Sequence, residues 1–272
     1  MKILFWSPIH GQAGTTSNIL ATAMLTGLYY RKKTVLTQTQ FQFNNLEAPI
    51  VGINPYNQDS KEYYREVGID TIIRCFKAAK LDKDTLDNCC IALDNTNILL
   101  LPGTSKSIKE AFDFEVETVM GNLLKSIEAI YGVVLVDISA GENALSKKLM
   151  TEADLIVVNL CQNMTITDEY FKSYAMNLPE KKLFYLFGKY DRNSKYNISN
   201  IRRKYKNIKS VNSGVIPNNT GFMDAMTDGK VIDFIRKNTV CNNLNENYYF
   251  ISSVMKATKK ILNQAGANIE RV

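Results

Sequence analysis

Short apolar runs alternate with longer stretches of helical periodicity along nearly the whole chain. Several short runs are continuous in valine, isoleucine and leucine, which is typical of strands buried on both faces of a parallel sheet. The strands predicted in this way span residues 2–6, 34–37, 98–101, 133–137, 155–160, 183–187 and 211–216. The helices predicted between them span residues 16–30, 61–79, 108–130, 142–151, 167–176 and 219–225. The alternation predicts βαβ units with right-handed crossovers.

This order of elements predicts a three-layer α/β/α fold around a mostly parallel twisted sheet of about seven or eight strands. No repeat or Pro/Gly-rich linker divides the 272 residues, so we predict one domain. Residues 1–243 would form its main part, and residues 244–272 would add a C-terminal helix and tail. That segment carries an apolar helical stripe of Ile251, Val254, Met255, Thr258, Ile261, Leu262 and Ala265. The stripe favours packing against the sheet over peripheral contact with a membrane.

Composition narrows the class of protein. Apolar residues make up 45% and charged residues 22%, as is ordinary for a globular chain. The net charge of +6 is too small by itself to indicate nucleic-acid binding. His10 is the single histidine, which nearly excludes a histidine-based metal site. The five cysteines form no C-x-x-C pair and no apolar run is long enough to span a bilayer, so we expect a cytoplasmic protein with reduced thiols.

A glycine-containing loop joins the first predicted strand to the first predicted helix. Its sequence is His10-Gly11-Gln12-Ala13-Gly14-Thr15-Thr16-Ser17. In doubly wound folds, ligands bind at the carboxyl ends of the strands and anions favour helix N-termini. The loop amides therefore indicate phosphate binding, and the hydroxyl of Thr16 or Ser17 would suit Mg²⁺. A plain strand-to-helix turn capped by threonine or serine explains the loop equally well.

Further motifs follow this loop in a fixed order. They are Gln38-Thr39-Gln40 and Asn45-Leu46-Glu47 after the second strand, Asp137-Ile138-Ser139-Ala140-Gly141 after an apolar run, Lys189-Tyr190-Asp191, and Val215-Ile216-Pro217. Over roughly residues 1–240, this colinear order resembles the MinD/ParA/TadZ family, the deviant Walker A group of P-loop ATPases. The resemblance implies the P-loop NTPase fold for this chain.

The site motifs depart from the family pattern, whose loop reads K-G-G-x-G-K-T-[ST]. His10 and Thr15 stand in place of its two lysines, and Gln38 and Gln40 stand in place of two aspartates. The resemblance implies ATP or ADP with Mg²⁺. The nucleotide would contact His10, Gly11, Gln12, Ala13, Gly14, Thr15, Thr16, Ser17, Asp191 and Pro217. Thr16 and Asp137 would hold the metal, and Asp137 and Gln38 are the candidates for a catalytic role.

Phosphoryl transfer depends on placed charges, so losing both lysines and both aspartates predicts little or no ATPase activity. The resemblance implies a homodimeric, nucleotide-responsive localisation or assembly factor that works with a protein partner. Its process would be polar positioning, pilus or secretion assembly, plasmid or conjugative-element maintenance, or division-site placement. One alternative is an active ParA-like partition ATPase that takes its charges from Lys2, Lys33, Lys106 or a partner. Another is a pseudo-NTPase scaffold that binds no nucleotide.

A basic run over residues 201–209 is the most concentrated charge in the sequence. It contains Arg202, Arg203, Lys204, Lys206 and Lys209, and no acidic residue. ParA-like proteins bind DNA non-specifically through basic patches, so the resemblance implies DNA contact here, weakened by salt. A solvated surface is the commoner role of such a run.

Overall fold

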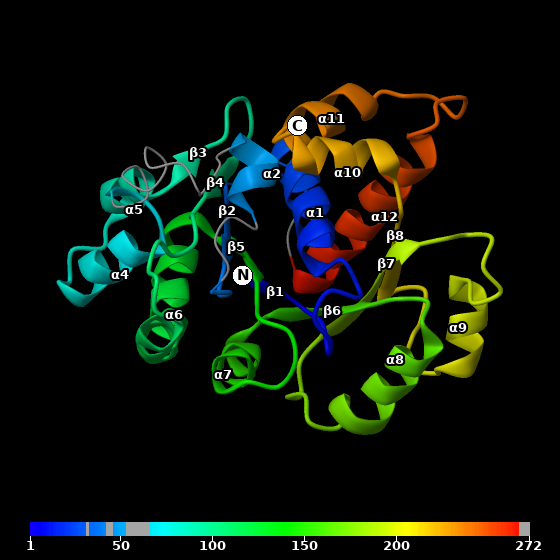
Figure 1. The fold of residues 1–272 in the computed structure, drawn as a ribbon, viewed down its shortest axis with the longest axis horizontal. Coiled ribbons are helices and arrows are strands. Elements are labelled where there is room, and N and C mark those ends of the chain that lie inside the picture. Colours follow the sequence, from blue (N-terminus) through cyan, green and yellow to red (C-terminus); the bar gives the residue numbers. More distant parts are fainter. Residues whose placement is uncertain (31–32, 42–45, 53–65, 267–272) are drawn as a thin grey trace.

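The computed structural model describes residues 1–30, 33–41, 46–52 and 66–266. Its strands are β1 (Lys2–Trp6), β2 (Thr34–Gln38), β3 (Ile91–Ala92), β4 (Ile98–Leu100), β5 (Val133–Asp137), β6 (Leu155–Leu160), β7 (Leu183–Tyr190) and β8 (Ser213–Pro217). Within the described residues they form one eight-stranded sheet in the order β3-β4-β2-β5-β1-β6-β7-β8 (Figure 1). The pairing of β3 with β4 is antiparallel and every other pairing is parallel. The expected mostly parallel sheet is confirmed.

Helices cover both faces of this sheet and complete the three layers (Figure 1). One face carries α1 (Thr15–Tyr29), α2 (Glu47–Val51), α10 (Thr220–Thr227), α11 (Val231–Asn238) and α12 (Tyr248–Ala265). The other carries α4 (Ile69–Lys77), α5 (Lys83–Cys89), α6 (Lys109–Tyr131), α7 (Ala144–Glu152), α8 (Met164–Glu169), a π-helical turn η1 (Tyr170–Tyr174) and α9 (Ile198–Lys204). In β1, Leu4 and Trp6 join one core while Ile3 and Phe5 join the other, because strand side chains alternate between faces.

Several boundaries differ from the sequence predictions. The last strand, β8, covers residues 213–217 rather than 211–216, and the helix expected over 167–176 is divided between α8 and η1. The helices α2, α5, α9 and α11 were not predicted, because none is longer than eight residues and an apolar period does not stand out over so short a stretch. Of the helix expected over 61–79, residues 61–65 lie outside the described residues, as do Asn45 and the tail from 267 to 272.

The C-terminal helix α12 packs its apolar stripe against the sheet. It contacts β8 and α1, and Ile251, Val254, Ile261 and Leu262 are at most 2% exposed. The expectation that this stripe belongs to the core is therefore confirmed, whereas the division of one domain into residues 1–243 and 244–272 stays a prediction. In the described part of the chain, no helix has the length and apolar content needed to cross a bilayer.

Candidate functional site

The loop after β1 leads directly into the N-terminus of α1. Gly14 is the N-cap residue in the left-handed conformation, with φ of 65°, and Gly11 is also left-handed, with φ of 75°. These values favour glycine because a residue with a Cβ is sterically strained at positive φ. No side chain caps α1. The amides of its first turn, which have no partner within the helix, are therefore available to an anion.

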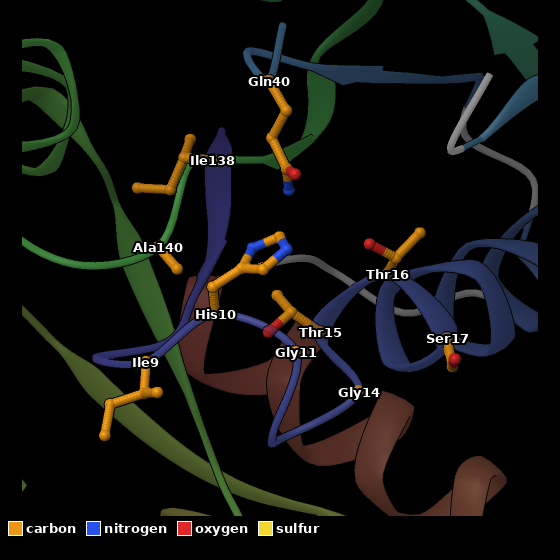
Figure 2. A pocket seen from close by; sticks show the side chains of 10 residues that line it. All are labelled: Ile9, His10, Gly11, Gly14, Thr15, Thr16, Ser17, Gln40, Ile138 and Ala140. Carbon is orange, nitrogen blue, oxygen red and sulfur yellow. The ribbon is translucent and has the colours of Figure 1, made fainter. Parts of the chain in front are cut away.

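A pocket of about 230 Å³ lies beside this loop. Its walls are Ile9, His10, Gly11, Gly14, Thr15, Thr16, Ser17, Gln40, Ile138 and Ala140 (Figure 2). The side chains of His10 and Gln40 point toward each other across the pocket, with Thr16 at one side. Among the residues that line it, none is Lys, Arg, Asp or Glu. The pocket thus offers backbone amides, hydroxyl groups and an imidazole, but no fixed charge.

Six of the eight predicted loop residues line this pocket, and the remaining two have other surroundings. Gln12 is exposed and Ala13 is buried. The Ala13 carbonyl accepts a hydrogen bond of 3.1 Å from the amide of Asn18, which also donates to Asn159 at 2.8 Å. This buried pair fixes the loop from beneath. Nothing in the local sequence singled it out, because its members come from α1 and β6.

Thr16, which lines the pocket, contacts Asp137, which does not. The Thr16 hydroxyl donates to Oδ2 of Asp137 at 2.7 Å, so the pair predicted to hold a metal is adjacent. Asp137 is fully buried and its Oδ1 has no hydrogen-bond partner. Burial raises the pKa of Asp137 to about 7, although hydrogen bonds from Thr16 and Gln40 pull it down. A buried carboxylate oxygen without a partner beside a hydroxyl group fits a hydrated Mg²⁺.

Such a cation would also need oxygen ligands from a bound molecule. The described residues contain no group of three His, Cys, Asp or Glu side chains that would hold a metal by themselves. Mg²⁺ is commonly bound by one or two protein oxygens together with substrate phosphates. The donor set at Thr16 and Asp137 therefore fits a metal that arrives with a phosphate ligand.

The two glutamines after β2 have different surroundings. Gln40 lines the pocket, whereas Gln38 does not. Gln38 is buried beside Gly103. A Cβ added to Gly103 would lie 2.5 Å from the Nε2 atom of Gln38. Of these two, Gln40 is consequently the side chain placed to meet a ligand. The sequence prediction named Gln38, together with Asp137, as a catalytic candidate, and the assignment of Gln38 stays a prediction without support from this geometry.

Lys189, at the end of β7, reaches back to the loop. Its Nζ donates to the carbonyl of Gly11 at 3.2 Å, and its side chain lies beside Gly14, where a Cβ would be 3.5 Å from Cγ and 3.6 Å from Cε. Lys189 adopts a left-handed φ of 48°, in a stretch where the pairing of β7 with β8 is irregular. Sequence reasoning singled out Lys189 within the motif Lys189-Tyr190-Asp191 but missed its contact with the loop, because 178 residues separate it from Gly11.

The lysines proposed as substitute charges lie elsewhere. The Nζ atom of Lys2 is 3.4 Å from Glu128, the ammonium of Lys106 contacts Glu115, and Lys33 lies over the ring of Tyr131 at 5.5 Å. None of the three lines the loop pocket.

Asp191 and Pro217 lie at the carboxyl ends of β7 and β8, on the same edge of the sheet as the loop. Tyr190 and Pro217 are paired in the sheet, and Asp191 follows Tyr190 directly. The exposed Asp191 accepts a hydrogen bond from the amide of Asn193 at 2.8 Å. Neither predicted residue lines the pocket. A contact with a ligand would require the ligand to extend past Lys189.

The basic run over residues 201–209 begins in α9. Arg202 donates to the Ser213 hydroxyl at 3.0 Å, and Lys204 is 2.7 Å from Asp168. Both are therefore engaged within the protein. The other three cations of the run, Arg203, Lys206 and Lys209, have exposed side chains.

Comparison with solved structures defines the class of fold. The eight-stranded, mostly parallel sheet with its helices matches the P-loop NTPase fold of the MinD/ParA type. No family model matches the sequence, and no curated protein matches it.

Among the similar structures is the septum site-determining protein MinD from Pyrococcus horikoshii, complexed with Mg-ADP. It has a TM-score of 0.68 and 14% identity, and the match covers 99% of this chain and 100% of that one. A ParA family ATPase from Chlorobium tepidum has a TM-score of 0.68 and 14% identity over 97% and 98% of the two chains. A putative plasmid partition protein from Borrelia burgdorferi, bound to AMPPNP, has a TM-score of 0.57 and 16% identity over 97% and 98%. At these identities the likeness shows the fold.

Proposed function

We propose that this chain is a nucleotide-binding localisation or assembly factor of the MinD/ParA/TadZ type with little or no ATPase activity. The observation that carries the proposal is the loop pocket, which combines a free helix N-terminus with the Thr16–Asp137 pair but has no charged side chain in its lining. The resemblance, together with Mg-ADP in Pyrococcus horikoshii MinD, supports ATP or ADP with Mg²⁺ as the ligand.

A homodimer and a protein partner belong to the same proposal. Solved structures of similar fold include a MinC:MinD cell division complex from Aquifex aeolicus and plasmid partition proteins from Borrelia burgdorferi. Division-site placement and plasmid partition are therefore two of the processes in which such a factor would act. Pilus, secretion or conjugation assembly rests on the resemblance to TadZ-type proteins.

The residues of the pocket divide the task of binding. Backbone amides of the loop and of the first turn of α1 would bind the phosphates, since an uncapped helix N-terminus is a ready site for anions. Thr16 and Asp137 would hold Mg²⁺, which when bound would offset the negative charge of the phosphates. His10 faces the same space and adds a donor on the side opposite α1.

The same pocket is poorly equipped for hydrolysis. Gln40 is a neutral amide that can orient a water molecule but accepts no proton at neutral pH. No lysine or arginine in the lining stabilises the charge that develops on transferring phosphoryl oxygens. Because each factor of ten in rate is about 1.4 kcal/mol, losing several such groups costs on the order of several powers of ten.

Calorimetric titration with Mg-ATP and Mg-ADP, combined with a phosphate-release assay, tests this function. We expect binding without appreciable turnover, and binding at least about tenfold weaker after Thr16→Val, because a charge-assisted contact is lost. Thr118→Val, at an exposed site on α6, is the matched control and should bind normally. Turnover that disappears in Asp137→Ala would instead support the active ATPase, and no binding of either nucleotide would support the scaffold.

DNA contact through residues 201–209 is an alternative that the exposed side chains of Arg203, Lys206 and Lys209 favour. Gel-shift titration at increasing salt would reveal it, since phosphate contacts weaken steeply with salt.

A further inference from the structure

A second cavity lies beside α7, on the face of the sheet opposite α1. Its volume is about 250 Å³, and its walls include Trp6 at the end of β1, Met150 of α7 and Tyr174 of η1. We call it the Trp6 cavity. Among the described residues, none lines both this cavity and the loop pocket. The Trp6 cavity is therefore a separate candidate site.

The lining of the Trp6 cavity is mainly apolar. Trp6 and Met150 are 1% and 2% exposed, and Leu178 is half-buried. The rings of Trp6 and Tyr174 lie 6.0 Å apart between centroids, with 57° between their planes. The Nε1 of Trp6 already donates to the carbonyl of Gly141 at 3.0 Å, so this ring has no unsatisfied donor. Ring faces and a thioether in one wall favour an aromatic ligand.

The volume of the cavity limits the ligand to a compact molecule. An engineered apolar cavity of about 150 Å³ binds benzene. Sites that enclose drug-sized ligands measure roughly 300–1,000 Å³. The Trp6 cavity, at about 250 Å³, falls between these two sizes. It therefore suits a single aromatic ring with small substituents.

Hydrogen-bonded polar side chains complete the lining. Lys147 donates to Oε2 of Glu142 at 2.8 Å, and Asn177 donates to Oε1 of the same carboxylate at 3.1 Å. All three residues are exposed, so they lie where the cavity opens to solvent. The hydrogen bonds from Lys147 and Asn177 lower the pKa of Glu142, which keeps its carboxylate ionised.

These polar residues determine which substituent the ring would carry. The charges of Glu142 and Lys147 offset each other, so the opening favours a neutral ligand over an ion. A carboxylate has about four lone-pair sites, and Glu142 uses two oxygens for one bond each, so it can accept from a further donor. A phenol provides such a donor and, like a tyrosine side chain, is neutral at pH 7.

We propose that the Trp6 cavity binds a neutral, single-ring aromatic molecule of the phenol class. The ring packs against Trp6 and Met150, and its hydroxyl donates to the carboxylate of Glu142. This site goes beyond the proposed nucleotide binding and does not depend on it.

Titration of the full chain with p-cresol tests the site. Trp6 is the single tryptophan of the sequence, so its fluorescence reports occupancy directly. We expect a saturable change in this emission, together with heat in a calorimetric titration. Toluene has the same ring and methyl group but no hydroxyl, and it should bind about tenfold more weakly because a hydrogen bond to a charged group is lost.

Two variants separate the apolar wall from the hydrogen bond. Leu178→Trp adds a larger side chain to the wall and should weaken p-cresol binding at least about tenfold in calorimetry. Met176→Trp is the matched control, because Met176 is 83% exposed in the same segment and does not line the cavity. Glu142→Gln, at an exposed site, should weaken the binding of p-cresol and leave that of toluene unchanged.

No saturable response to p-cresol, or full affinity in Leu178→Trp, would overturn the site. Equal binding of toluene and p-cresol, or unchanged p-cresol affinity in Glu142→Gln, would overturn the phenol class. Either failure would leave the proposed nucleotide binding intact, since the loop pocket has other walls.

Discussion

Lys189 has a backbone conformation that is unusual for lysine, and the contacts of its side chain with the loop stabilise that conformation. A left-handed φ costs a residue with a Cβ about 1 kcal/mol or more. In return, the side chain reaches the loop, where it bonds to Gly11 and covers Gly14. The loop itself contains no lysine or arginine, but the ammonium group of Lys189, from the neighbouring strand β7, contacts it.

Replacing Lys189 by methionine tests whether its contact with the loop supports the proposed nucleotide binding. The variant keeps the apolar stem but loses the ammonium group, so we expect ATP and ADP to bind about tenfold more weakly, on the order of 1.4 kcal/mol. Lys172→Met, on the exposed side of η1, is the control for the general loss of a positive charge. Affinities equal to those of the unmodified chain would show that the contact has no part in binding.

Some residues of the candidate site were predictable from the sequence, and the structure distinguished between other residues that look equivalent in the sequence. Thr16 and Asp137 were predictable, since one lies in the first turn of a helix after a glycine loop and the other ends a buried strand. Gln38 and Gln40 look equivalent in the sequence, but Gln40 lines the pocket while Gln38 lies near Gly103. At the end of a strand, either of two residues spaced two apart can face a ligand. Which of them does so depends on how the chain packs against the neighbouring strands.

At the scale of elements, β7 is the strand whose length matters most for the site. The apolar run predicts an end at residue 187, but the strand continues to Tyr190 and carries Gly188 and Lys189 against the loop. Hydrophobic periodicity did not reveal this extension, because glycine and lysine are poor strand signals. The pairing with β6 ends at Phe187, and beyond a break in register the extension pairs with β8 through Tyr190 and Pro217.

Gly188→Ala tests the close approach of β7 to the loop. The added Cβ would overlap the Ala13 carbonyl and lie 2.5 Å from the amide nitrogen of Asn18, so either the loop or the strand must move. We expect a loss of about 1–3 kcal/mol in the free energy of unfolding, measured with denaturant, together with weaker nucleotide binding. Gly121→Ala in α6 meets only the flexible Glu152 side chain and should be neutral or stabilising. A stable Gly188→Ala protein with full affinity would contradict the packing described here.

At the scale of the whole molecule, α12 closes one face of the sheet. The same apolar spacing describes a helix on a membrane and a helix on a core, and amphipathic pattern alone does not separate them. In the structure the stripe lies against β8 and α1, where Ile261 is fully buried. The stripe is therefore engaged within the protein.

Truncating Ile261 measures how much this closure stabilises the fold. Ile261→Ala removes three buried carbons and should lower the free energy of unfolding by about 2–4 kcal/mol, as judged by denaturant titration. Lys259→Ala, on the exposed side of the same helix, should change it by less than about 0.5 kcal/mol. A small effect of Ile261→Ala would mean that α12 contributes little to the core, and would reopen its role as a membrane-binding helix.

The sequence by itself determined the fold class and the position of the glycine-containing loop between β1 and α1. Buried parallel strands need continuous apolar runs, and a loop between strand and helix needs glycine, so both features are visible over short stretches. Only the tertiary structure decided what surrounds the loop. Asn159, Lys189 and Asp191 come from β6, from β7 and from the loop after it, far along the chain from Gly11. A parallel sheet gathers the carboxyl ends of its strands at one edge, so residues distant in sequence become neighbours there.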